Sequence, residues 1–171
     1  ADPQKPLAWA LASSSDGTGN GLWSSDDAGR TFTQRYAMPN HLPSGLRISD
    51  DGRTLIIGSV TNAMPRQGVL HVSTDGGMNF TTLILTTQLD GQPITFFKPT
   101  WVDSKTSSAL YIQAEVADGT ALLRTDGSAQ PVEVLRTPGV ITAMGWNPPR
   151  DLLFVATTKG MFSTSGAPSF T

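Results

Sequence analysis

Carboxylates are the side chains in this sequence that come nearest to a catalytic pattern. Asp27 and Asp75 lie in two similar segments 48 residues apart, and each stands two residues before a glycine. Paired carboxylates hydrolyse glycosides only when roughly 5–10 Å separates them. Aspartate followed closely by glycine is typical of a tight turn, in which the carboxylate accepts backbone N–H groups. We therefore expect Asp27 and Asp75 to build turns rather than to form an acid and base pair.

A second pair of carboxylates, Asp90 and Asp103, flanks the predicted strand 94–99 and is the least unsuitable pair for a glucanase, although Asp90-Gly91 is typical of an ordinary turn. His41 and His71 are the two histidines, and neither has a companion at the spacing of a metal site or a catalytic triad. The sequence has no Gly-x-Ser-x-Gly elbow, no phosphate loop and no cysteine. We expect no catalytic residue, no metal and no cofactor.

The composition describes a turn-rich globular chain of 171 residues, with 17 glycines, 12 prolines and 15% charged residues. Its net charge of -2 and its scattered basic residues disfavour a nucleic-acid or anionic-membrane partner. No apolar run approaches the roughly 20 residues of a membrane helix. Residues 1–6 are expected to be a tail, because Ala1-Asp2-Pro3 is typical of a signal-peptide cleavage product or a cloning remnant. We expect a secreted, periplasmic or cell-surface location.

The elements that must position these side chains are short β-strands. Helical periodicity is absent, and fourteen β-rich runs alternate with turns such as Asp51-Gly52 and Asp118-Gly119. The predicted strands are 7–13, 21–25, 31–36, 45–49, 54–60, 68–73, 80–86, 94–99, 109–116, 121–124, 132–135, 140–146, 152–157 and 160–163. Many short, evenly spaced strands predict a sandwich, a barrel or a propeller.

A repeated motif decides among these folds. Residues 25–32 (SDDAGRTF) and 73–80 (STDGGMNF) share the pattern Ser-x-Asp-x-Gly-x-(Thr/Asn)-aromatic. Two weaker copies follow, of which 124–128 keeps the aspartate Asp126 and 163–170 keeps the first serine and the last aromatic residue. Successive copies are offset by 48, 51 and 39 residues, which suits one four-stranded blade per repeat.

The repeat resembles the Asp-box, or bacterial neuraminidase repeat, family of β-propellers, and the resemblance covers nearly the whole chain. It implies an all-β propeller of four-stranded antiparallel blades, at about 7–38, 44–88, 93–137 and 139–171. Sialidases, xyloglucan-cleaving glucanases and sortilin-type receptors carry this repeat. Their motifs lie at the blade periphery and are structural, which implies that role here for Ser25, Asp27, Gly29, Thr31, Phe32, Ser73, Asp75, Gly77, Asn79, Phe80 and Asp126.

The resemblance also implies where a ligand would bind, since propeller ligands usually occupy an axial face built from loops. Here that face includes 39–43, 61–67, 86–92 and 100–105. A sialidase needs an arginine cluster and a Tyr–Glu pair, but the chain has no Arg-Ile-Pro motif and only two tyrosines. An exposed tryptophan stacks on a sugar ring or on a partner protein. The candidate ligand-binding residues are His41, Arg47, Arg66, Trp101 and Asp103.

The number of strands bears on whether the ring closes. The motif links the third and fourth strands of a blade, so about four blades are present and one strand is missing at each end. A closed ring of four such blades would be strained. We expect the chain to be part of a larger ring, either cut from a longer polypeptide or completed by a second chain or a copy of itself. We expect an exported, non-catalytic binding or scaffolding module for a protein or glycan ligand. The alternative is a glycoside hydrolase whose site is completed by missing blades.

Overall fold

This computed structural model describes residues 8–49, 51–63, 66–85, 88–102, 110–125, 130–147 and 152–165. Every regular element in these ranges is a β-strand. The same ranges contain no helix of the length and hydropathy needed to cross a membrane. The predicted tail 1–6, and the candidate residues Asp103 and Asp126, lie outside the described residues.

The strands form four antiparallel sheets in chain order, and within each sheet consecutive strands pair. The first sheet contains β1 (Ala8–Ala12), β2 (Gly21–Ser25) and β3 (Thr33–Ala37). The second contains β4 (His41–Ile48), β5 (Leu55–Thr61), β6 (Gly68–Ser73) and β7 (Thr81–Ile84). The third contains β10 (Phe96–Val102), β11 (Leu110–Val116), β12 (Gly119–Thr125) and β13 (Val132–Thr137). The fourth contains β14 (Ile141–Asn147), β15 (Leu152–Thr157) and β16 (Gly160–Ser165).

A two-stranded hairpin lies between the second and third sheets. It pairs β8 (Gln88–Leu89) with β9 (Gln92–Pro93), and the sequence analysis did not predict it. The turn of this hairpin places Asp90 and Gly91 at positive φ (52° and 77°). Aspartate tolerates this left-handed conformation better than most side chains, so Asp90-Gly91 is the turn that the sequence predicts.

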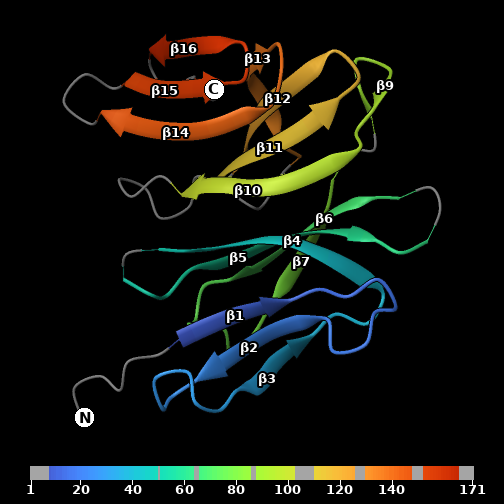
Figure 1. The fold of residues 1–171 in the computed structure, drawn as a ribbon, viewed down its shortest axis with the longest axis vertical. Helices are drawn as coiled ribbons and strands as arrows, with labels where there is room; N and C mark the ends of the chain where they lie inside the picture. The colour runs from blue at the N-terminus through green and yellow to red at the C-terminus, as the bar shows by residue number, and fades with distance from the viewer. Residues whose placement is uncertain are drawn as a thin grey trace.

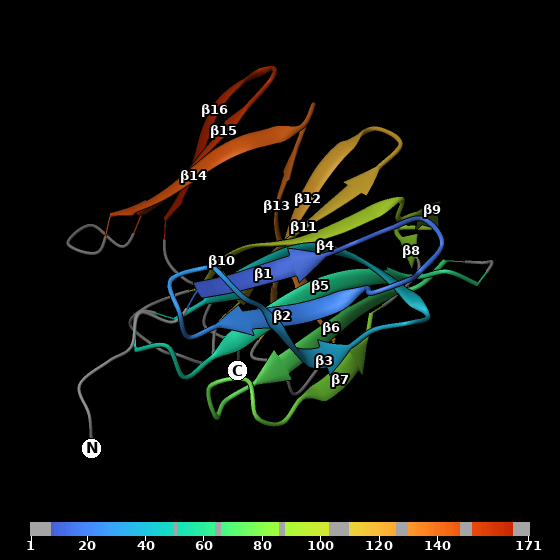
Figure 2. The same ribbon diagram turned by 60° about the horizontal axis from the view of Figure 1, so that its bottom comes forward.

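The four sheets lie one above another in chain order, with the first sheet at one end of the stack and the fourth at the other (Figure 1). Figure 2 shows that the sheets are rotated relative to one another, and that the fourth is tilted away from the rest. The all-β fold with antiparallel blades is therefore confirmed. In the described residues the second and third blades have four strands, and the first and fourth have three. The described part of the chain is an open arc of blades, because its first and last sheets do not meet.

The apolar core is divided among the spaces between successive sheets. Leu22, Leu55 and Ile57 pack between the first and second sheets, together with Met38. A larger cluster fills the space between the second and third sheets, and another lies between the third and fourth. Strands with a sheet on both sides are therefore buried on both faces. In β5, for example, the first five residues are all buried.

The antiparallel meander divides the connections between two opposite edges of the stack. The connector edge carries the links between successive sheets and the links 12–21, 61–68, 116–119 and 157–160. The aspartate-turn edge carries the two good motif copies, which we name the first aspartate turn (25–32) and the second aspartate turn (73–80). Three of the four predicted axial loops lie on the connector edge. The fourth, 100–105, follows β10 and begins on the opposite edge, so the expected single face is wrong for it.

Two predicted strand boundaries are wrong for the same reason. His41 belongs to β4 rather than to a loop, and Trp101 lies within β10 rather than after it. Both strands contain a proline beside a register shift, at Pro43 and at Pro99. Each strand is at the edge of its sheet, where a proline that lacks an N–H breaks no ladder hydrogen bond. The sequence analysis placed Pro43 in a loop and ended the strand 94–99 at Pro99.

Candidate functional site

The connector edge carries a surface pocket between the third and fourth sheets. It has a volume of about 340 Å³ and is open to solvent. Thr95, the segment 115–119, Gly139 and Val140 line it. Two of these residues are the carboxylates Glu115 and Asp118. The pocket therefore offers hydrogen-bond acceptors from charged side chains beside small residues that leave the backbone accessible.

A charged cluster centred on Arg136 of β13 adjoins this pocket. The guanidinium contacts Glu133 at 2.7 Å, Asp90 at 2.8 Å and Asp118 at 3.7 Å. Gln92 adds a hydrogen bond from Nε2 to Asp118 Oδ2, at 3.2 Å. The hydrogen bonds that Glu133 accepts raise the pKa of Arg136 above its usual value. The cluster joins the β8–β9 hairpin to the third sheet and places three carboxylates around one cation.

A second polar cluster lies between the first and second sheets, in the interior. His71 of β6 is 1% exposed, and Ser59 of β5 is fully buried. His71 Nε2 lies 2.9 Å from Ser59 Oγ, and Nδ1 lies 3.1 Å from the hydroxyl of Tyr36. Ser59 Oγ in turn donates to the carbonyl of Val69, at 3.3 Å. A neutral imidazole protonated on Nε2 satisfies all of these groups, with the Tyr36 hydroxyl donating to Nδ1.

The environment of His71 disfavours its charged form. Burial, and then the charge of the neighbouring His41, lower the pKa of His71 to about 4. The His41 ring lies edge-on to His71, with centroids 5.1 Å apart, and burial lowers the pKa of His41 as well. Perturbed pKa values often mark active sites, but Ser59 and His71 are shielded from any substrate. Their chemistry is structural: they satisfy polar groups inside the sheet stack.

The two aspartate turns share one hydrogen-bond pattern. In the second turn, Asp75 Oδ1 accepts the backbone N–H groups of Met78 and Asn79, both at 3.0 Å. Asp75 Oδ2 accepts the amide of Asn79 at 2.7 Å, and Ser73 Oγ donates to Oδ1 at 2.8 Å. These bonds, led by that of the Asn79 backbone, lower the pKa of Asp75 to about 2. The carboxylate is a fixed acceptor rather than a proton donor.

Asp27 makes the equivalent bonds in the first turn. It accepts the backbone N–H groups of Arg30 and Thr31 at 3.0 and 2.9 Å, and the Thr31 hydroxyl at 2.7 Å. The Thr31 hydroxyl contributes most to holding the pKa of Asp27 far below its usual value. Ser25 Oγ donates to Asp27 and accepts the N–H of Gly29.

The structure distributes the candidate ligand-binding residues over both edges. His41 begins β4 at the connector edge, where Arg66 also lies, exposed, in the link after β5. Arg47 and Trp101 lie at the opposite ends of β4 and β10, on the aspartate-turn edge. Arg47 Nη1 donates to the carbonyl of Leu46 at 3.0 Å. The described residues therefore do not form one site from these candidates.

Sequence reasoning missed the residues that the connector edge does bring together. Arg136 and Asp90 are 46 positions apart, and no local pattern links them. Asp118 was assigned only to a turn, although it contacts both Arg136 and Gln92. The one local signal is Glu133, three residues before Arg136. Side chains three residues apart point to opposite faces of a regular strand. Glu133 and Arg136 share one face because β13 is irregular, with a register shift opposite Leu122 and Leu123.

Comparison with known proteins identifies no family. No protein-family model matches the chain, and no curated protein matches it. One solved structure with a similar course of the backbone is XC5397 from Xanthomonas campestris, which is described as a gluconolactonase. The two chains are 15% identical with a TM-score of 0.48, and the match covers 85% of this chain and 44% of the other. This chain therefore spans less than half the length of that protein, and so weak a similarity carries no functional argument.

Proposed function

We propose that this chain is a non-catalytic binding module that recognises a carbohydrate or protein ligand at its connector edge. The observation that carries the proposal is the pocket of about 340 Å³ beside the Arg136 cluster. A carboxylate held in place by an arginine, as Asp118 is by Arg136, accepts hydrogen bonds from hydroxyl groups without having to reorganise. Asp118 and Glu115 are the acceptors that line the pocket. A carbohydrate, which is rich in hydroxyl donors, is the ligand class that this lining favours.

The rival function, glycoside hydrolysis, needs one carboxyl group as a proton donor and another as a nucleophile or base. Apart from Glu115, the described carboxylates at and beside the pocket bond to other side chains. Asp90 and Glu133 bind Arg136, and Asp118 binds both Arg136 and Gln92. The two tyrosines are also used in packing, since Tyr111 is 2% exposed and Tyr36 bonds to His71. These bonds support binding over turnover.

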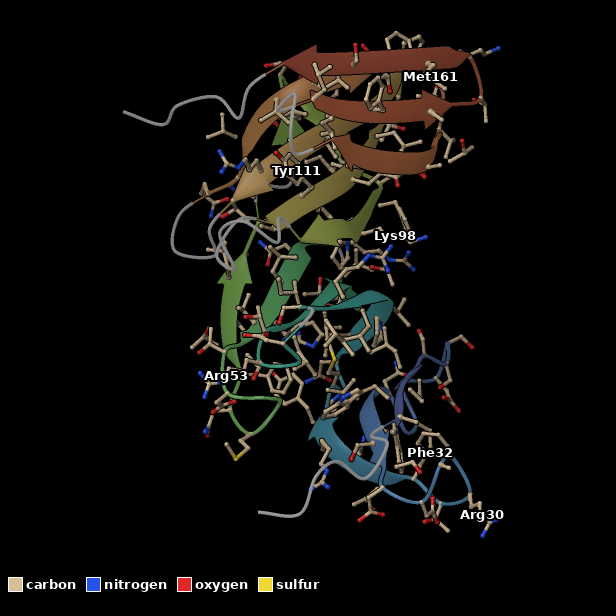
Figure 3. The ribbon with its side chains drawn as sticks, turned by 90° about the vertical axis from the view of Figure 1, so that its left-hand side faces the viewer. Arg30, Phe32, Arg53, Lys98, Tyr111 and Met161 are labelled. Carbon is tan, nitrogen blue, oxygen red and sulfur yellow. The ribbon has the colours of Figure 1, made fainter. Side chains whose placement is uncertain are left out.

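We further propose that the arc of blades is completed by a second chain or by a copy of this one, outside the cell. Both ends of the stack expose apolar side chains (Figure 3), namely Phe32 (42% exposed) in the first aspartate turn and Met161 (74% exposed) in the fourth sheet. Phe154 is 37% exposed, and it lies on the same face of the fourth sheet as Met161, because Met161 pairs with Ala156. Native mass spectrometry tests this: a dimer or larger species is expected, and a stable monomer contradicts it.

A glycan array followed by calorimetry tests the binding function. We expect at least one immobilised glycan to bind and to be recovered without cleavage. Asp118→Asn and Glu115→Gln should each weaken binding by about tenfold, since each removes a charged acceptor. Asp51→Asn is the matched control, because Asp51 lies in the link between β4 and β5 on the opposite edge. The Asp51→Asn variant should bind the glycan with the same affinity as the unsubstituted protein.

Two outcomes would contradict the proposal. Release of a shorter sugar from the bound glycan, measured by chromatography, would assign the rival function. Equal affinities for the Asp118, Glu115 and Asp51 variants would show that the ligand does not bind at the connector edge.

A further inference from the structure

A second pocket opens on the aspartate-turn edge, between the first and second sheets. Its volume is about 410 Å³. Trp9, Ser24 and Arg35 of the first sheet line one side, and residues 76–78 of the second aspartate turn line the other. It is on the opposite edge of the stack from the pocket at Asp118 and is independent of the function proposed for that pocket.

Arg35 is held in this pocket by an irregularity of β3. Leu22 pairs with Tyr36 and Trp23 pairs with Gln34, so Arg35 is the extra residue of a β-bulge. Bulges re-aim side chains. Here the Nε of Arg35 donates to Ser24 Oγ at 2.7 Å, and Ser24 is 3% exposed. A buried hydroxyl therefore fixes the guanidinium while its two terminal nitrogens keep their N–H donors.

The charge of Arg35 has no counterpart among the described residues. The described ion pairs all belong to Arg136 on the other edge. The third sheet has a similar bulge, opposite Leu122 and Leu123, and there the extra residue is Val134, which packs against the apolar core. The equivalent position in another blade is thus apolar and structural. A fixed, solvent-accessible arginine at this position is suited to bind an external anion.

Trp9 and Met78 form the apolar part of the pocket. Trp9 is half-buried, and its indole edge lies over Gly77, where a Cβ atom would come within 2.9 Å of the ring. Met78, at the rim, is 78% exposed. Arginine, tryptophan and methionine are enriched in protein–protein interfaces, and arginine and tryptophan are frequent among the residues that dominate their affinity. This combination favours a protein segment over a sugar as the occupant.

We propose that this pocket binds a carboxylate of a partner protein, with an adjacent apolar side chain of that partner against Trp9 and Met78. The terminal nitrogens of Arg35 donate two parallel hydrogen bonds to the carboxylate. Ser24 positions the guanidinium, and residues 76–78 close the opposite side. The apolar neighbour distinguishes this ligand from a simple anion.

N-acetyl-L-phenylalanine is a suitable probe, because it carries a carboxylate beside an aromatic side chain. Its amide, N-acetyl-L-phenylalaninamide, is the matched control without the charge. In ¹H–¹⁵N NMR titrations we expect the acid to shift the Trp9 indole and Arg35 Nε signals, with a dissociation constant on the order of 1 mM. The amide should bind about tenfold more weakly or not at all. The other three tryptophans serve as internal references.

Variants test whether binding depends on Arg35 itself or only on the net positive charge of the protein. Arg35→Gln should weaken binding of the acid by about tenfold, and Arg35→Lys should recover only part of it, because lysine lacks the fork. Arg30→Gln removes the same charge from the first aspartate turn and should bind normally. The NMR spectrum of each variant shows whether the sheets remain folded. Ser24→Ala tests the positioning of Arg35 in a second way, because it removes the hydroxyl that holds the guanidinium and leaves the guanidinium itself in place.

Three results would overturn the proposal. The first is equal binding of the acid and the amide. The second is an equal loss of affinity in Arg30→Gln and Arg35→Gln. The third is tighter binding of glucuronate than of N-acetyl-L-phenylalanine, which would assign the pocket to an acidic glycan instead of a protein.

Discussion

The two aspartate turns have the same hydrogen bonds but different surroundings. In the second turn, Phe80 stacks on Tyr36 of the preceding sheet, with ring centroids 4.3 Å apart, and Gly77 packs against Trp9. In the first turn, Phe32 is 42% exposed and Gly29 is also exposed, because no sheet precedes the first one in the described residues. The motif therefore makes its turn locally, and the neighbouring blade decides whether that turn also holds two sheets together.

The largest difference in stability between the two aspartate turns is expected when their equivalent glycines, Gly29 and Gly77, are substituted. Both have positive φ, 86° at Gly29 and 84° at Gly77, so alanine strains the backbone at either position. Only Gly77→Ala also drives a methyl group into Trp9, at 2.9 Å. We expect Gly77→Ala to lower the free energy of unfolding by about 3 kcal/mol and Gly29→Ala by about 1 kcal/mol. Urea unfolding measures both, and equal losses would show that the second turn is no more embedded than the first.

Replacing the equivalent phenylalanines, Phe80 and Phe32, by alanine should give the next largest difference in stability between the two turns. Phe80→Ala removes a ring that stacks on Tyr36 and packs against the core between the first two sheets. We expect a loss of about 2–3 kcal/mol in the free energy of unfolding. Phe32→Ala should cost less than about 1 kcal/mol, because Phe32 is 42% exposed and no sheet precedes it in the described residues. A large loss for Phe32→Ala in solution would mean that something covers this end of the stack, and would support ring completion.

A pH series sharpens the comparison by testing the junction between the first two sheets alone. The folded pKa of His71 is about 4 against an ordinary value of 6.5, so only the unfolded chain takes up a proton between these values. The contribution of His71 is complete above pH 6.5 and is lost as the pH falls toward 4. We expect the free energy of unfolding to fall by about 2 kcal/mol between pH 6.5 and pH 5.

The control for this series is His71→Gln, whose stability should change much less over the same range. The aspartate turns do not interfere, because the pKa of Asp75 is about 2 and that of Asp27 is also far below its usual range. If His71→Gln kept the same pH dependence, the loss of stability at low pH would arise from His41 or from groups elsewhere.

The sequence predicted the fold well where short-range interactions decide it. Each predicted β-rich run corresponds to an observed strand, with boundaries displaced by a few residues. The errors in β4 and β10 arose because a proline ends a central strand but is tolerated at an edge. Whether a strand is at an edge depends on its neighbours, which local sequence does not reveal. The hairpin β8–β9 was missed because its strands have only two residues each.

Much less of the candidate site was predictable. The sequence did not reveal that the candidates are divided between two edges, with His41 and Arg66 at the connector edge and Arg47 and Trp101 at the other. Arg136, which organises the charged cluster, was not considered, because its partners Asp90 and Asp118 come from two separate turns. Arg35 has a role only because a bulge turns it toward Ser24.

The sequence by itself determined the strands, the aspartate turns and the repeat, because each depends on residues close together in the chain. Asp75, for instance, bonds to residues no more than four positions away. Only the tertiary structure decided which side chains meet between sheets. Tyr36 reaches His71 across 35 positions, and Arg136 reaches Asp90 across 46. Such contacts depend on how the sheets stack and twist, which arises from packing over the whole arc rather than from any local pattern.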